Sequence, residues 1–214
     1  MSETKKERIK QIYKEIKPTI ESRIKEFEDI WEEGDERVFD EMAFCLFTPQ
    51  SKAKVCWDTV KELKKNDLLL EGEEDTISDE IKMVRFRNNK AGYVVEARNK
   101  FIENDKSIKE KISSFDDQKK ARKWIVDNVK GLGYKEASHF LRNIGKGENL
   151  AILDRHILRN LESLGVINEI PKTLTKKRYL NIEKKMKEFS DEIGIQLGHL
   201  DLVLWYKETG EVFK

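Results

Sequence analysis

The sequence predicts an all-α protein, and two observations support this. Apolar residues recur at helical spacing along most of the 214-residue chain, and no segment shows the strict alternation of a half-buried strand. In addition, Gly131 and Gly133 lie between two such apolar stretches, which is typical of a tight turn that joins two helices. With 38% hydrophobic residues, the chain can bury a core as one domain or as two closely packed subdomains.

The first third of the chain predicts several helices in succession. Pro18 predicts a break or kink within the first helical stretch, because proline lacks the amide hydrogen of an interior helix bond. The polar residues 64–67 are expected to end the last helix of this part. The apolar positions are Ile9, Ile12, Tyr13, Ile16, Ile20, Ile24, Phe27 and Trp31, then Phe39, Met42, Ala43 and Leu46, then Val55, Cys56, Val60 and Leu63.

Further along, pairs of polar residues mark expected helix starts. Thr76 and Asp79 have the spacing of a capping box and predict a short helix, and a longer helix is expected over residues 91–102. Ser114 with Asp117 is expected to open the helix that precedes the two glycines. A final helix is expected over residues 197–205, before a short tail.

The segment from Val129 to Ala137 is the most informative part of the chain. A tight turn at Gly131 and Gly133 exposes backbone N–H groups, and a helix N-terminus with free N–H donors attracts an anion such as a DNA phosphate. Lys130 lies beside this turn, and Lys135 lies in the first turn of the second helix. Taken alone, the two glycines are more simply an interhelical turn and Lys135 a solvated lysine.

Asp154, which follows Lys135 by 19 positions, favours a catalytic interpretation. A neutral lysine amine can attack an electrophilic carbon and form a Schiff base, although lysine is ordinarily protonated at neutral pH. A helix N-terminus, burial or a cationic neighbour favours the neutral amine, whereas a carboxylate in contact favours the ammonium. Asp154 also precedes an apolar-periodic segment, so it is expected to be an N-cap, a role compatible with catalysis.

Together, the hairpin, the lysine, the glycines at 145 and 147 and the aspartate resemble the helix-hairpin-helix DNA glycosylase superfamily. The segments GLGYKEASHFLRNIG, ILDRHILRNL and DLVLWYKETGEVFK most resemble the archaeal-type 8-oxoguanine DNA glycosylase/lyases, from about residue 35 to Lys214. Two features depart from the superfamily. Ile152 and Leu153 stand where a proline often precedes the aspartate, and two cysteines cannot provide the four-cysteine iron–sulfur cluster of some members.

The resemblance implies a fold and a reaction. It implies one glycosylase domain over residues 1–214, with two closely packed helical subdomains and an active-site cleft between them. The hairpin is expected at about 116–145 and the aspartate loop at about 146–156.

The resemblance also implies a bifunctional enzyme that flips 8-oxoguanine out of double-stranded DNA. Lys135 would attack C1′, expel the base and cleave the abasic site by β-elimination. Asp154 would stabilise positive charge on the sugar or manage the lysine proton, and no metal or organic cofactor is needed.

The same resemblance suggests additional DNA contacts. His156 matches a histidine that contacts a phosphate, and Gln50 matches a side chain that fills the gap left by the flipped base. Trp205 and Phe86 are candidates to stack on that base, although both are compatible with core positions, which we favour for Phe86. Arg85, Arg87 and Lys90 are candidates for contacts with the DNA backbone, although solvated positions are the simpler expectation for all three. The tail residues Phe213 and Lys214 are implicated in closing the base pocket.

Charge is segregated along the chain although the net charge is only +1. From Gln118 to Arg159 there are ten Lys or Arg and four Asp or Glu, a balance of +6; from Glu21 to Met42 there are three and ten, a balance of −7. The first segment suits phosphate contact, and the second is expected to be a solvated acidic helix face.

No apolar run reaches the roughly 20 residues of a membrane span. We therefore expect a cytoplasmic monomer whose cysteines, Cys45 and Cys56, are buried thiols.

Three other interpretations stay open at this point. The enzyme could excise another oxidised base, such as an oxidised pyrimidine. A non-catalytic helix-hairpin-helix module would bind DNA through phosphates alone, with strong salt dependence and no abasic-site cleavage. A helical protein-interaction bundle would have no affinity for DNA, which the pairing of Lys135 with Asp154 argues against.

Overall fold

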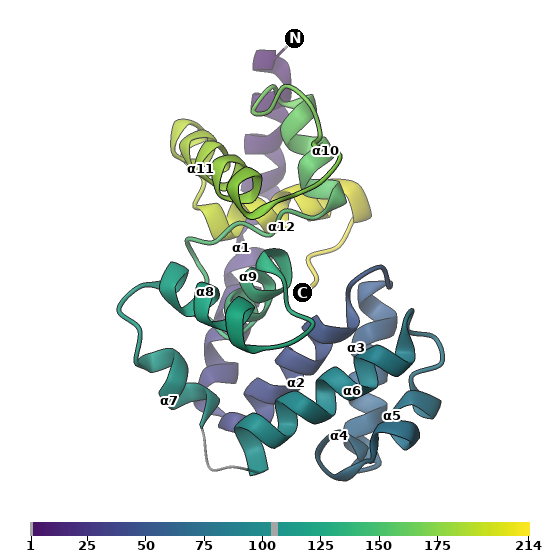
Figure 1. Ribbon diagram of the computed structural model, residues 1–214. Coiled ribbons are helices and arrows are strands. Elements are labelled where there is room, and N and C mark those ends of the chain that lie inside the picture. The colour runs from purple at the N-terminus through teal and green to yellow at the C-terminus, as the bar shows by residue number, and fades with distance from the viewer. Residues whose placement is uncertain (1, 104–106) are drawn as a thin grey trace.

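The computed structural model describes residues 2–103 and 107–214, and the regular elements within these ranges are all helical (Figure 1). The prediction of an all-α fold is confirmed. The helices are α1 (Ser2–Glu32), α2 (Asp35–Phe47), α3 (Ala53–Lys65), α4 (Leu68–Glu71), α5 (Glu74–Glu80), α6 (Arg87–Arg98), the π-helical turn η1 (Asn99–Glu103), α7 (Ile108–Ser113), α8 (Gln118–Asn128), α9 (Tyr134–Asn143), α10 (Arg155–Ser163), α11 (Lys176–Ile193) and α12 (Leu197–Thr209). None of the described helices is both long and apolar enough to cross a membrane.

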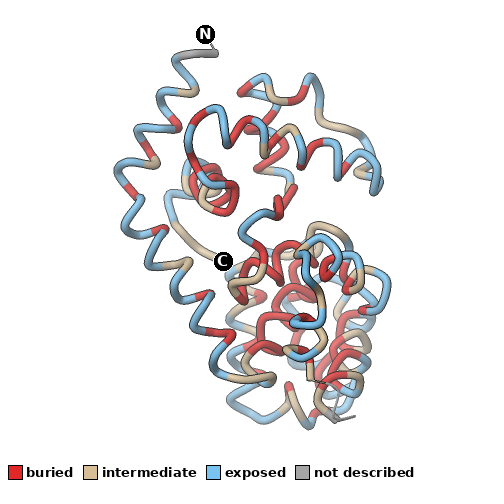
Figure 2. Tube along the Cα trace, turned by 90° about the vertical axis from the view of Figure 1, so that its left-hand side faces the viewer, coloured by how far each residue is buried: buried red, intermediate tan, exposed pale blue. Residues whose placement is uncertain are grey.

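The helices form two lobes, each with its own hydrophobic core. The large lobe consists of α2 to α9, and the small lobe of α10 to α12. Helix α1 belongs to both: Ile9 and Ile20 pack in the small lobe, whereas Phe27 and Ile30 pack in the large one. Figure 2 shows α1 running along one edge of the molecule past both lobes. The expectation of two closely packed subdomains is therefore confirmed.

Of the break or kink predicted at Pro18, the break is wrong, because helix α1 continues through this residue. Proline removes one hydrogen bond of the helical ladder. Ile16 and Ile20 on either side are buried against the small lobe, and this packing holds the helix together across the missing bond.

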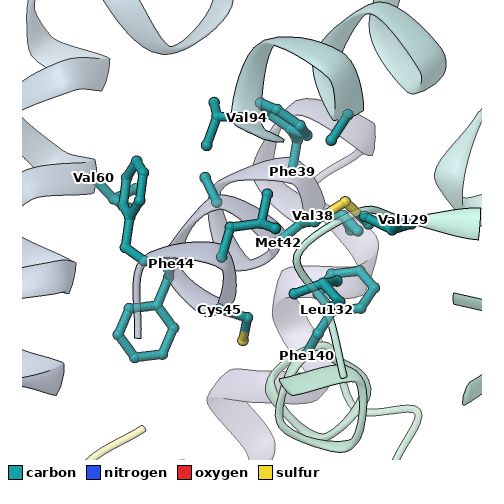
Figure 3. Close-up of a cluster of buried hydrophobic side chains, with 14 of the residues drawn as sticks. Val38, Phe39, Met42, Phe44, Cys45, Val60, Val94, Val129, Leu132 and Phe140 are labelled. Carbon is teal, nitrogen blue, oxygen red and sulfur yellow. The ribbon is translucent and has the colours of Figure 1, made fainter. Parts of the chain in front are cut away.

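Helix α2 forms the centre of the large lobe and is buried on nearly all sides (Figure 3). Phe39 and Met42 pack among residues of α6, α9 and the hairpin turn. The solvated acidic face expected for this region is wrong for two residues, because Asp40 and Glu41 are buried. Asp40 pairs with Lys64 at 2.7 Å, and Glu41 accepts a hydrogen bond from Arg37 at 2.9 Å.

Two of the expected helix starts are displaced. Helix α5 begins at Glu74, so Thr76 lies inside it. Ser114 ends α7, and Asp117 alone caps α8 by accepting a hydrogen bond from the Lys119 amide at 2.8 Å. The helices α4, α7 and α11 are not among those predicted from the sequence.

The hairpin joins α8 to α9 and packs against α6. Gly131 has φ +94°, a backbone conformation that favours glycine, and a Cβ there would lie 2.4 Å from the Tyr93 ring. Gly133, with φ −86°, is the N-cap of α9. Leu132 between them is buried in the core of the large lobe. The first glycine is therefore required by backbone geometry and close packing, and the turn joins two helices, as the glycine pattern predicts.

Candidate active site

A cleft of about 950 Å³ lies between the two lobes. On the large lobe its wall consists of the turn from Thr48 to Val55 and one face of α9. On the small lobe the wall consists of the start of α10, one face of α12 and the C-terminal tail. Figures 1 and 2 both place the C-terminus between the lobes. The cleft expected between the subdomains is present.

Lys135 is the second residue of α9 and lines the cleft. Its side chain is 23% exposed, so the amine is partly shielded but still accessible from the cleft. The Nζ atom lies 3.5 Å from Oε1 of Glu136, which is the carboxylate that pairs with it. In the described part of the chain, no ion pair joins Lys135 to Asp154.

Asp154 lines the same cleft and is the N-cap of α10, as expected. Its Oδ1 atom accepts a hydrogen bond from the Ile157 amide at 2.8 Å. The backbone of Asp154 is extended, with φ −84° and ψ −178°, which is usual for an N-cap. One carboxylate oxygen is thus used for capping, and the other has no hydrogen-bond donor among the described residues.

A buried polar network holds the non-helical segment that leads to Asp154. The Tyr179 hydroxyl donates to the Ala151 carbonyl at 2.5 Å, and the Ala151 amide donates to Glu183 at 3.0 Å. Glu183 accepts two hydrogen bonds from Arg122 of α8, at 2.5 and 2.8 Å. Because a buried backbone segment outside helices needs partners for its polar groups, this network fixes the position of Asp154 relative to α8 and α11.

Helix α9 brings two further charged or polar side chains into the cleft, His139 and Arg142. With Lys135 they have the spacing i, i+4 and i+7, which places them on one helix face. Burial lowers the pKa of His139 well below its usual value, so the ring is neutral near pH 7. Both of its ring nitrogens are buried without a hydrogen-bond partner among the described residues.

Asp201 of α12 is another carboxyl group of the cleft. It is 6% exposed and lies 3.4 Å from Arg142. Burial raises the pKa of Asp201 to about 7, an effect that the positive charge of Arg142 opposes. No sequence pattern singles out His139, Arg142 or Asp201 as site residues. A single acidic residue within the apolar run 197–205 was the available signal for Asp201.

Trp205 lies in the cleft one helical turn beyond Asp201 and is half-buried. Its ring meets that of His156 edge to face, with centroids 5.2 Å apart. His156 also lines the cleft, and its Nδ1 atom is buried without a hydrogen-bond partner in the described structure. Asp154, His156 and Trp205 therefore lie on the same wall of the cleft.

Gln50 lies on the opposite wall at the tip of the turn between α2 and α3, exposed and with φ +57°. Lys90 holds this turn from beneath by donating to the carbonyls of Phe47 and Pro49, both at 2.7 Å. The solvated position expected for Lys90 is wrong, because the residue is only 3% exposed. Burial lowers the pKa of Lys90 to about 8.

Phe86 does not line the cleft with Trp205, and the core position favoured for it is also wrong. It is 52% exposed and has φ +60°. The Cζ atom of the Arg85 guanidinium group lies 5.2 Å from the centroid of the Phe86 ring. Arg85 itself lines the cleft and is solvated, whereas Arg87 bonds to Asp79 at 3.2 Å. The loop before α6 therefore presents an exposed aromatic ring next to the mouth of the cleft.

The C-terminal tail turns back into the cleft, where Phe213 and Lys214 form part of its lining. The Lys214 ammonium pairs with buried Glu41 and lies 3.5 Å from the centroid of the Trp57 ring. Burial lowers the pKa of this ammonium, and Glu41 opposes the effect. These contacts hold the tail in the cleft.

The hairpin turn lies outside this cleft and forms the wall of a separate shallow groove of about 430 Å³. Gly131 and Gly133 line this groove with Lys130, whose amine lies 3.6 Å from Glu96. Both cysteines are buried free thiols, as expected. Among the described residues, no group of three or more His, Cys, Asp or Glu is arranged to hold a metal ion.

Comparisons with known proteins identify the family of the chain. Residues 20–195 match a family model described as 8-oxoguanine DNA glycosylase. An 8-oxoguanine DNA glycosylase/AP lyase of Fusobacterium nucleatum is 49% identical over 96% of both chains, and one of Methanocaldococcus jannaschii is 42% identical over 94% of both. The crystal structure of the M. jannaschii enzyme with DNA containing 8-oxoguanine superposes with a TM-score of 0.90 at 39% identity, covering 98% of this chain and 99% of the other. Given this agreement in sequence and fold, the chain belongs to the 8-oxoguanine DNA glycosylase family.

Proposed function

We propose that this protein excises 8-oxoguanine from double-stranded DNA and then cleaves the strand at the abasic site, as a monomer acting on DNA in the cytoplasm. The observation that carries the proposal is that Lys135, Asp154 and Trp205 line one cleft large enough for a nucleobase. A base inside a duplex must be flipped out to meet these groups, at a cost of a few kcal/mol. Every group that the proposed reaction needs comes from one chain.

In this proposal the duplex lies across the mouth of the cleft. The N–H groups of Gly131 and Gly133 and the amine of Lys130 bind a backbone phosphate, and His156 binds another. Gln50 enters the gap left by the extruded nucleotide. Trp205 stacks on the flipped base, because an aromatic face stacks on any base. The tail residues Phe213 and Lys214 close the pocket, while Phe86, outside it, contacts the DNA beside the lesion.

The chemistry follows from the reach of Lys135 into this cleft. Its amine attacks C1′, the glycosidic bond breaks with its electron pair on the base, and a Schiff base forms that permits β-elimination. Asp154 stabilises the positive charge that develops on the sugar. This sequence of steps uses side chains alone.

Borohydride trapping tests the proposal, because it reduces the imine to a permanent link between protein and DNA. We expect a covalent complex with a duplex that contains one 8-oxoguanine and none with the undamaged duplex. Lys135→Ala should abolish trapping while duplex affinity stays within about threefold of wild type. Lys184→Ala, on an exposed part of α11, is the matched control and should trap normally.

Other outcomes favour the other functions. Trapping of another lesion in preference to 8-oxoguanine would move the substrate to that lesion. Salt-sensitive binding without trapping or cleavage would favour a non-catalytic DNA-binding module. Trapping by Lys135→Ala equal to wild type would refute Lys135 as the nucleophile.

A further inference from the structure

The attack by Lys135 raises a question of proton transfer. Its ammonium group carries three protons, and one remains on the nitrogen of the iminium. The other two must leave, and they end on the departing base and on O4′ of the opened sugar. A proton acceptor within reach of Nζ is therefore needed before the nitrogen has an electron pair with which to attack.

Asp154 is poorly placed to be this acceptor in the free protein. It makes no ion pair with Lys135 in the described structure, and its Oδ1 atom is already used by the Ile157 amide. Glu136, in contrast, lies in the cleft with one carboxylate oxygen 3.5 Å from the lysine nitrogen. Its side chain is 16% exposed, which limits the competition of water for this carboxylate.

The position of Glu136 in the helix explains its orientation. It is the third residue of α9, and from this position a glutamate side chain folds back toward the N-cap. A Cβ at Gly133 would lie 3.1 Å from Oε2 of Glu136, so the carboxylate does lie over the hairpin turn. One oxygen thus faces the turn while the other faces the amine of Lys135.

We propose that Glu136 is the base that accepts the proton of Lys135 and returns it to the departing nucleobase. This inference rests on the proposed function and gives proton transfer and stabilisation of the sugar cation to two different carboxylates. Glu136 takes one proton from the ammonium, and the neutral amine then attacks C1′. The C1′–N bond breaks with its electron pair on the base, which receives that proton from Glu136. Asp154 is left to stabilise the sugar cation.

Glu136→Gln tests this proposal because glutamine keeps the shape and the capping ability of glutamate but cannot accept the proton. At pH 7 we expect single-turnover base release to fall by at least about 10²-fold, as for loss of a general base. Trapping on a preformed abasic site should fall too, because that reaction also needs a neutral amine. The deficit should shrink as the pH rises and solvent removes the proton instead. Affinity for the lesion duplex should stay unchanged.

The pH profiles must be compared between variants, because other groups near this pair also titrate. Lys90, with its pKa of about 8, changes charge in the same alkaline range, and the negative charge of Glu136 raises that pKa. Glu136→Gln therefore also shifts the titration of Lys90, whereas Glu136→Asp keeps the negative charge and serves as the comparison. Asp154→Asn provides the contrast, since we expect its deficit to be the same at every pH. The titratable or charged groups facing Lys135 and Glu136 are Cys45, Cys56, Lys90, His139, Asp154 and Asp201.

Two further variants make the test decisive. Glu136→Asp restores an acceptor and should recover part of the rate at pH 7, and Glu148→Gln, an exposed glutamate outside the cleft, should behave as wild type. The proposal is overturned by a Gln variant within threefold of wild type, by a deficit that does not change with pH, or by an Asp variant as slow as the Gln variant. Wild-type protein that traps no lesion at all would refute the proposed function as well.

Discussion

Asp154 combines a structural role with a proposed chemical one, and two substitutions separate them. Asparagine is as good an N-cap as aspartate, so Asp154→Asn should keep the Ile157 hydrogen bond and the melting temperature. Without the negative charge, we expect base release to slow by about 10²-fold or more. Asp154→Ala should lose, in addition, about 1 kcal/mol of stability.

Single-turnover kinetics beside thermal melts at the same pH measure the two effects. A folded Asp154→Asn protein that releases the base at the wild-type rate would show that the charge is not needed.

At the residue scale, the sequence predicted the groups that belong to a recognisable motif and missed those that meet only in space. Lys135 and Asp154 do line one cleft. Asp201 and His139 were not identified, because helical spacing shows which residues share a face but not that this face meets the cleft. The left-handed backbone of Phe86, which turns its ring outward, has no local sequence signal comparable to glycine.

At the scale of an element, the turn between α2 and α3 depends on the buried amine of Lys90. Burial lowers the pKa of Lys90 from 10.5 to about 8, so between these values the unfolded chain binds more protons than the folded one. The contribution of Lys90 to stability should therefore rise with pH across this range. Relative to Lys90→Met, we expect the free energy of unfolding of the wild type to be larger, and the protein therefore more stable, at pH 10 than at pH 7.5.

Urea unfolding of both proteins at the two pH values measures this difference. Lys184→Met supplies the reference for an exposed lysine and should show no such trend. A constant or falling difference between wild type and Lys90→Met would contradict the assigned burial effect.

Helices were easier to predict than their boundaries. The apolar periodicity of α1, α2 and α3 reflects packing faces that the structure confirms. The break at Pro18 did not occur because packing on both sides outweighs one missing hydrogen bond. Ser114 lies at the end of α7 instead of opening α8, because a serine followed by an acidic residue also occurs where one helix ends and another begins.

At the scale of the whole molecule, buried ion pairs connect the two lobes. Arg122 of α8 pairs with Glu183 of α11, and Arg142 of α9 pairs with Asp201 of α12. Removing one partner of a buried pair leaves an uncompensated charge, so Arg122→Met should cost about 3–5 kcal/mol of stability. Adding Glu183→Leu should recover part of that loss.

Urea unfolding of the single and double variants measures this coupling, with Lys184→Met as the control from an exposed pair worth at most about 1 kcal/mol. If the double variant is as unstable as the sum of both single variants, the pair does not act as a unit. The two-lobed architecture followed from the family resemblance, but these connections between lobes did not, because their partners lie about sixty residues apart.

The unbroken course of α1 has a mechanical consequence. A helix of 31 residues resists bending, and this one is buried in both cores. It therefore connects the two lobes rigidly and opposes a hinge motion that would move them apart. When this protein binds a duplex, we expect the DNA to change conformation and the protein to stay nearly unchanged. The DNA bends and extrudes a nucleotide, while the two lobes keep their relative position.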